Sequence, residues 1–118
     1  MRLYRPVGKN ELALIEASGF SAFPERLPEQ PIFYPVLNLE YARYIASNWN
    51  KPNGYVTAFE INDDFISQYE VHTVGSHIHK EYWIPADELK EFNSNIVGKI
   101  YIIEKYYNTD ELELLPRS

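Results

Sequence analysis

Residues 54–61 read Gly-Tyr-Val-Thr-Ala-Phe-Glu-Ile, and this stretch decides the fold. Val56, Ala58 and Glu60 alternate with an aromatic or β-branched residue at every position between them, which is the period-two pattern of a β-strand. Further strands are predicted downstream over residues 69–74, 80–84 and 96–107. Because strands and helices do not alternate strictly in this half of the chain, the pattern favours an α+β fold over a doubly wound parallel sheet.

Upstream of this region, two short strands are predicted over residues 2–7 and 32–34. A helix is predicted over residues 10–18, with Asn10 as its N-cap and Gly19 as its stop signal. A second helix follows Asn38 and extends to residue 48, with an apolar stripe along one face.

A third helix is predicted to start at Pro85, where the missing N–H of proline costs little. A turn or short helical stretch is expected around residues 65–68, after Asp63 and Asp64. We therefore expect a single compact α+β domain over residues 1–118 with about three helices, in which residues 110–118 are a tail that frays or packs.

Composition and charge exclude several classes of protein. The net charge of −6 argues against a general affinity for nucleic acid or for an anionic membrane surface. No apolar run reaches the roughly 18 residues that span a bilayer, and residues 1–7 show no secretory signal, so we expect a cytoplasmic protein. The chain has no Cys, which excludes disulfides and cysteine-based zinc sites. Its 5 glycines form neither a dinucleotide-binding nor a phosphate-binding glycine motif.

Residues 20–31 contain three prolines and are predicted to form an irregular loop. A loop of this length is long for a small domain, and long loops often carry function. A proline-stiffened connector is the alternative interpretation.

The three histidines lie within eight residues, at positions 72, 77 and 79. On a continuous strand, His77, His79 and Glu81 would point to one face, because side chains alternate along a strand. Such a set is able to bind Zn²⁺ or another divalent metal. The alternative is a polar strand edge exposed to solvent.

A dispersed constellation of residues is the remaining candidate for chemistry. It consists of Arg5 on the first strand, Tyr34 on a strand before a helix, and Glu81 at the start of a late strand. The sequences around these residues are Leu3-Tyr-Arg5, Phe33-Tyr-Pro-Val-Leu-Asn-Leu-Glu-Tyr-Ala-Arg-Tyr-Ile-Ala46 and Glu81-Tyr-Trp-Ile-Pro85.

With these three segments in this order, the sequence resembles the ADP-ribosyltransferase-like family, in particular short bacterial proteins loosely labelled "ADP-ribosylation/crystallin". The resemblance implies a split, twisted, mainly antiparallel sheet. It also implies that NAD is the substrate, that no metal is required, and that the protein transfers ADP-ribose or hydrolyses NAD at the nicotinamide–ribose bond.

The resemblance assigns a role to each residue. Glu81 is the implied catalytic carboxylate, which holds a ribose hydroxyl and stabilises an oxocarbenium-like transition state. Tyr34 would stack on the nicotinamide ring, and Arg5, with Tyr4 beside it, would hold the pyrophosphate by a bidentate contact.

Two positions depart from the family's pattern. The segment after Tyr34 is Pro-Val-Leu and lacks a hydroxyl, for which Thr57 is the candidate substitute. His79 stands two residues before Glu81, where transferases that modify protein side chains often carry Gln or Glu. The implied NAD-binding set is therefore Tyr4, Arg5, Tyr34, Thr57 and His79.

Two alternatives stay open. The chain is also interpretable as a non-catalytic module that binds a protein partner, since its many tyrosines suit an interface as well as a core. Each candidate residue also has a purely structural interpretation, with Arg5 in a surface ion pair, Tyr34 in the core and Glu81 solvated on a strand edge.

Overall fold

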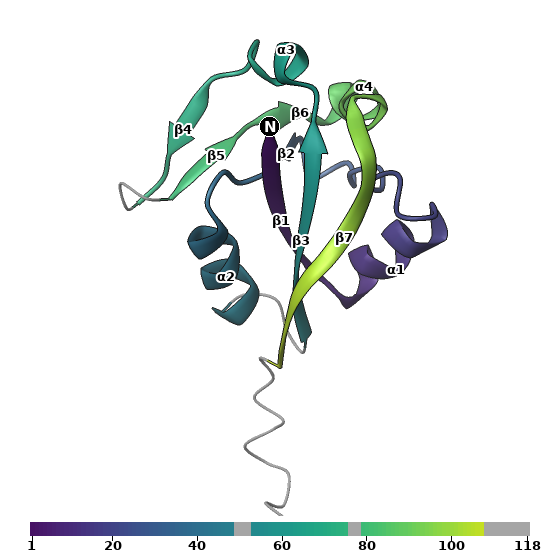
Figure 1. Ribbon diagram of the computed structural model, residues 1–118, viewed down its shortest axis with the longest axis vertical. Coiled ribbons are helices and arrows are strands. Elements are labelled where there is room, and N and C mark those ends of the chain that lie inside the picture. The colour runs from purple at the N-terminus through teal and green to yellow at the C-terminus, as the bar shows by residue number, and fades with distance from the viewer. Residues whose placement is uncertain (49–52, 76–78, 108–118) are drawn as a thin grey trace, which may run out of the picture.

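The computed structural model describes residues 1–48, 53–75 and 79–107. Its central element is a three-stranded antiparallel sheet with the order β1-β3-β7, formed by β1 (Arg2–Gly8), β3 (Asn53–Ile61) and β7 (Ile96–Tyr107). Figure 1 shows these strands side by side in the middle of the molecule. The stretch with the clearest alternation thus becomes the middle strand.

A second group of strands lies beside β1. In it, β2 (Ile32–Phe33) pairs antiparallel with β6 (Ile84–Pro85), and β4 (Val71–Thr73) pairs antiparallel with β5 (Lys80–Tyr82). A bridge between Val36 and Glu81 continues the β2–β6 register, so residues 32–37 run antiparallel to residues 80–85 over their whole length.

A single isolated bridge joins the two groups of strands in the described chain. The backbone of Tyr4 in β1 exchanges two hydrogen bonds with Val36, at N···O distances of 2.9 and 2.8 Å. All the described strand pairs are antiparallel, and the sheet is split at this bridge. The predicted α+β class is therefore confirmed, whereas the resemblance to an ADP-ribosyltransferase core stays a prediction.

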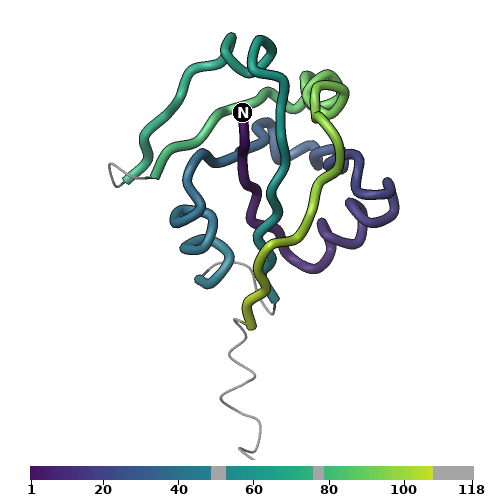
Figure 2. The backbone as a smooth tube through the Cα atoms, viewed as in Figure 1, coloured from purple at the N-terminus to yellow at the C-terminus, as the bar shows by residue number. Residues whose placement is uncertain are grey.

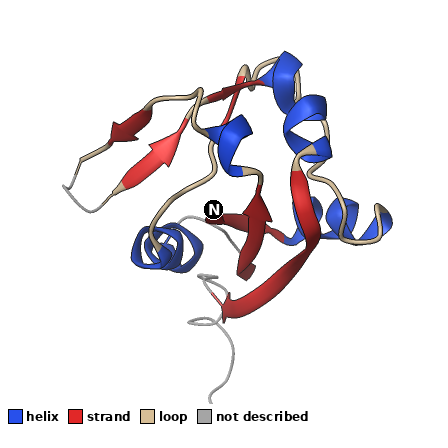
Figure 3. Ribbon diagram, turned by 45° about the horizontal axis from the view of Figure 1, so that its top comes forward, coloured by secondary structure: helices blue, strands red, loops and turns tan. Residues whose placement is uncertain are grey.

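The described residues contain four α-helices: α1 (Lys9–Ala17), α2 (Leu39–Asn48), α3 (Asp63–Ile66) and α4 (Leu89–Ser94), the last preceded by a 3₁₀ turn, η1 (Ala86–Glu88). The central strands lie between α1 and α2 (Figure 1). Figure 3 shows the same arrangement with helices in blue around the strands in red. None of the described helices is long and apolar enough to cross a membrane.

Two groups of buried side chains hold these layers together. The larger one, called the first core, contains five phenylalanines together with aliphatic side chains from β1, α1 and β7. The smaller one, called the second core, lies under α2 and contains Val36, Tyr41, Ala42, Ala46 and Val56. Because neighbouring residues of β3 contribute to different cores, the two cores lie on opposite faces of the sheet.

The loop predicted over residues 20–31 contains no helix or strand, and it begins two residues earlier than predicted, so it is called loop 18–31; Figure 2 traces it between α1 and β2. It is nevertheless attached to the interior. The backbone N–H and carbonyl of Phe23 form two 2.9 Å hydrogen bonds with the side-chain amide of Asn93. The Phe23 ring is buried against Phe33 and Phe59. The loop is thus held in one place by its own aromatic residue.

Some element boundaries differ from those that the sequence predicts. Helix α1 starts at Lys9 with Gly8 at its N-cap, so Asn10 lies inside the helix and does not cap it. The reason is that β1 runs directly into α1, which leaves no room for a separate cap. The strand predicted over residues 69–74 is shorter, and Pro85 ends β6 before the 3₁₀ turn. The predicted stop at Gly19 is consistent with its positive φ of 74°.

Candidate functional site

A cavity of about 460 Å³ lies where the sheet is split. Its walls come from β1, from the start of α1, from residues 34–36, from α2 and from β5 with the residues that follow it. The lining residues are Arg5, Pro6, Val7, Glu11, Tyr34, Val36, Tyr41, Ile45, Val74, Glu81 and Trp83. Both cores contribute to this lining, so the cavity lies at their junction. Its volume is within the range of small-molecule sites.

The split in the sheet explains why a cavity forms here. After the bridge at Tyr4 and Val36, no further strand pair joins β1 to residues 32–37. Side chains therefore close the space that backbone hydrogen bonds would fill in a continuous sheet. Arg5 makes one such link, since its Nη1–H donates to the carbonyl of Tyr34 at 3.3 Å.

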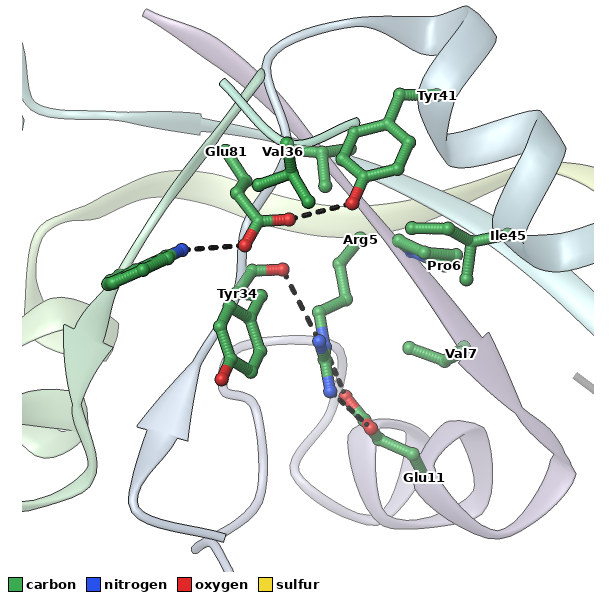
Figure 4. Close-up of a pocket in the computed structure, with 11 residues that line it drawn as sticks. Arg5, Pro6, Val7, Glu11, Tyr34, Val36, Tyr41, Ile45 and Glu81 are labelled. Atoms are coloured by element: carbon green, nitrogen blue, oxygen red, sulfur yellow. Dashed lines mark hydrogen bonds and ion pairs between the residues drawn. The ribbon is translucent and has the colours of Figure 1, made fainter. Parts of the chain in front are cut away.

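Glu81 is the buried acidic residue of the cavity, with only 7% of its surface exposed. Its Oε1 accepts a 2.8 Å hydrogen bond from the Tyr41 hydroxyl, and its Oε2 accepts a 2.6 Å bond from the indole Nε1–H of Trp83. Figure 4 shows the carboxylate held between these two donors. Both donors are neutral, and no ion pair to Glu81 is found in the part of the chain that the structure describes.

Aromatic rings fix the orientation of the two donors. The Trp83 ring stacks on His72, with 3.7 Å between centroids and 6° between planes, and meets Tyr34 edge-on at 6.5 Å. The Tyr41 ring stacks on His79 at 4.4 Å and 8°. These contacts hold the hydroxyl and the indole N–H in place, so the carboxylate is positioned before any ligand enters.

Arg5 lies at the other end of the cavity and is already paired. Its Nε–H and Nη2–H donate to the two carboxylate oxygens of Glu11, each at 2.9 Å. This is the bidentate arrangement that arginine also uses for phosphate. The guanidinium carbon lies 4.6 Å from the centroid of the Phe33 ring. The structural interpretation of Arg5 as part of an ion pair is therefore correct, although the pair is partly buried.

Three of the sequence-predicted residues meet in the cavity, namely Arg5, Tyr34 and Glu81. Tyr34 is 38% exposed and Glu81 is buried, so the structural interpretation, which placed Tyr34 in the core and Glu81 in solvent, describes neither residue.

The structure does not bring the other predicted residues into the lining. Thr57 is fully buried in β3, and its hydroxyl donates to the carbonyl of Arg5 at 2.7 Å. Tyr4 packs against the second core under α2. His79 lies behind Tyr41, against which it stacks. His77 lies outside the described residues.

Sequence reasoning missed Glu11, Tyr41 and Trp83. For Trp83 a signal was present, because a residue two positions after Glu81 on an extended chain points to the same side. Tyr41 lies on the buried face of α2, but hydrophobic periodicity does not show which group the hydroxyl of a tyrosine contacts. Glu11 lies in the first turn of α1, where an acidic residue is common without any binding role, and its pairing with Arg5 depends on how β1 enters α1.

Tyr41 gives the site a measurable pH dependence. Burial of its hydroxyl, reinforced by the hydrogen bond to Glu81, raises the pKa of Tyr41 well above its usual value of 10.0. A group whose pKa is higher in the folded state stabilises the fold fully below its unfolded pKa and loses that contribution as the pH rises above it. The free energy of unfolding should therefore fall above pH ~10, by at most about 1.4 kcal/mol per pH unit from this group.

The Tyr41→Phe variant tests this expectation. At neutral pH it should be less stable than the unmodified protein by about 1.5–3 kcal/mol, because a buried carboxylate loses a donor. The difference should shrink when urea unfolding is repeated at pH values from ~10 upwards. Tyr44→Phe, an exposed tyrosine on the same helix, is the matched control. A constant difference across this pH range would show that the Tyr41 hydroxyl does not carry the effect.

The predicted metal cluster gains no support from the described residues. Among them, no group of three or more His, Asp or Glu side chains is arranged to hold a metal ion. One member of the predicted set, His77, lies outside these residues, so the metal hypothesis stays a prediction.

No protein-family model matches this chain, and no curated protein or solved structure matches it either. The geometry of the cavity is therefore the observation from which a function is inferred.

Proposed function

We propose that the cavity binds NAD and that the protein uses Glu81 to break the bond between nicotinamide and ribose, transferring ADP-ribose or hydrolysing NAD. One observation carries this proposal. Arg5, Tyr34 and Glu81 come from three segments far apart in the sequence, and all three line one cavity. A carboxylate and an exposed aromatic ring suit the ribose and the nicotinamide of NAD, and a basic residue brings positive charge to the same cavity, as the phosphates of NAD favour.

The charge of Glu81 supports a cationic ligand. Its two hydrogen-bond donors are neutral, so the negative charge of the carboxylate is oriented without a cation to offset it. The rings of Tyr34, Tyr41 and Trp83 line the same cavity. Aromatic faces and a carboxylate together attract a flat cation, and the nicotinamide ring of oxidised NAD is one.

The proposed reaction follows from this arrangement. The bond between C1′ of the ribose and the ring nitrogen of nicotinamide breaks, and its electron pair leaves with the now neutral nicotinamide. Positive charge develops on C1′ and the ring oxygen of the ribose, where the Glu81 carboxylate stabilises it. A nucleophile with a lone pair, either water or an acceptor side chain, then bonds to C1′ and releases one proton.

NAD should raise the melting temperature of the protein if it binds to the folded state. At about ten times the dissociation constant, the expected stabilisation is ~1.4 kcal/mol, or roughly 6 °C for a domain of this size. Tyr34→Ala should reduce this shift, because it removes an aromatic wall of the cavity. Tyr44→Ala, which changes an exposed tyrosine outside the cavity lining, should leave it unchanged. The absence of any shift with saturating NAD would count against the proposal.

A protein-interaction module is the second candidate, and β7 favours it. In the described chain this 12-residue strand pairs with β3 on one side only, and it exposes the apolar side chains of Val97, Tyr101 and Ile102. Exposed edge strands are able to pair with another chain. Failure of NAD to change the melting temperature would favour this candidate.

A further inference from the structure

The cations near the cavity are not equally available to a ligand. Among the described residues Arg5 is the cation that lines the cavity, but each of its three guanidinium nitrogens already donates within the protein, Nε and Nη2 to Glu11 and Nη1 to the carbonyl of Tyr34. A phosphate group would have to displace Glu11 to take the same contact. The charge of Arg5 is thus largely offset by its own protein partner.

A second arginine lies beside this pair, and among the described residues it has no ion-pair partner. Arg26, in loop 18–31, places its guanidinium carbon 5.9 Å from the centroid of the Phe33 ring, the same ring that Arg5 contacts. Its Nε is buried from solvent, and no hydrogen-bond acceptor for it is found in the part of the chain that the structure describes. Within the described residues, no ion pair to Arg26 is found. A buried donor without a partner is costly, which marks a place where an acceptor from outside the chain would be stabilising.

The charges around Arg26 also favour the binding of an anion. Burial lowers the pKa of Arg26 from its usual value, and the neighbouring Arg5 lowers it further, while Glu11 and Tyr34 act in the opposite direction. The side chains of Arg5, Arg26 and Glu11 together carry a net charge of +1. An arriving anion would therefore meet an uncompensated cation in a partly buried place, where its charge is weakly screened.

The loop holds Arg26 in position. Phe23, three residues earlier, is buried and hydrogen-bonded to Asn93, and Pro24 and Pro28 restrict the backbone on either side of Arg26. The guanidinium is therefore presented from a segment with few alternative conformations. This limits the entropy that binding would otherwise cost.

We propose that Arg26 is the residue that binds the phosphate groups of the ligand, and that Arg5, held by Glu11, forms the adjacent wall. This inference rests on the proposed function, because it assigns the pyrophosphate of NAD to Arg26 and not to Arg5. Loop 18–31 is then part of the binding site and not a simple connector.

Inorganic pyrophosphate is the probe that tests this inference without NAD chemistry. Calorimetric titration should detect binding to the unmodified protein, and Arg26→Gln should weaken that binding about tenfold or more, as expected when a charge-assisted contact is lost. Arg26→Lys keeps the charge but not the fork, so it should bind with intermediate affinity. Arg43→Gln, which removes an exposed arginine paired with Glu104, should bind like the unmodified protein. Because the chain carries a net charge of −6, general attraction of an anion does not explain such a difference.

The Glu11→Gln variant gives an independent check. Replacing this carboxylate by an amide removes the bidentate ion pair of Arg5. It also raises the net charge of the cluster by one, so pyrophosphate should bind more tightly. No binding of pyrophosphate to the unmodified protein, or equal binding by the Arg26→Gln variant, would overturn the inference. Pyrophosphate binding that depends on Arg26, together with no effect of NAD, would support the anion site and contradict the proposed NAD chemistry.

Discussion

Glu81→Gln should lower the rate of nicotinamide release from NAD by about 10²–10³, which corresponds to a loss of ~2.7–4 kcal/mol of transition-state stabilisation. The substitution keeps the shape of the side chain but removes its negative charge. The amide also disturbs the local hydrogen bonds, because its NH₂ group has no lone pair for the Tyr41 hydroxyl or the Trp83 indole N–H that it faces. The rate is measured by following free nicotinamide over time.

Two controls separate chemistry from folding and binding. Glu40→Gln makes the same chemical change at an exposed position at the start of α2 and should leave the rate unchanged. The melting temperature of the Glu81→Gln variant shows whether the protein is folded at the temperature of the assay. A folded Glu81→Gln variant that releases nicotinamide at the unmodified rate would exclude Glu81 as the catalytic carboxylate.

Phe92→Ala should have the largest effect on stability. The Phe92 ring is fully buried, and its centroid lies 5.3 Å from that of Phe33, 5.8 Å from Phe59 and 6.1 Å from Phe65. Truncation removes apolar surface, three aromatic contacts and the atoms that fill the space between α4 and β3. The expected cost is about 3–5 kcal/mol of the free energy of unfolding, a large fraction of the ~5–15 kcal/mol typical of a domain.

Urea unfolding measures this cost, with Leu14→Ala as the control. Leu14 is an apolar residue on α1 that is 56% exposed, so its truncation should change the free energy of unfolding by no more than ~0.5 kcal/mol. If Phe92→Ala cost less than about 1 kcal/mol, the ring would not be packed as the structure describes.

Local periodicity was enough to predict most of the elements. The alternation over residues 54–61 and the long apolar pattern over residues 96–107 correspond to β3 and β7 almost residue for residue. Helix α2 also has the predicted bounds. The pairing of strands was not predictable in the same way, because it depends on contacts between distant segments. Nothing in the sequence around Val36 indicates that it bridges both Tyr4 and Glu81.

The candidate site was predictable in part. The direction in which side chains point along the strands explains why some of the predicted residues do not line the cavity. Alternation sends Tyr4 and Arg5 to opposite faces of β1, so the two neighbours do not share a site. The same rule places Thr57 on the face of β3 that carries Phe59, a residue of the first core, and Thr57 is fully buried there. By contrast, Tyr41, which donates to Glu81, and Glu11, which pairs with Arg5, come from helices whose packing is set by the whole fold.

The most direct test of the central claim is a titration with NAD followed by two-dimensional NMR. If NAD binds in the cavity, the backbone amide signals of Arg5, Tyr34 and Glu81 and the indole N–H signal of Trp83 should shift together and saturate with one affinity. The signals of exposed residues on β7, such as Val97 and Tyr101, should not move. Unchanged spectra at millimolar NAD, or shifts confined to residues outside the cavity lining, would contradict the account.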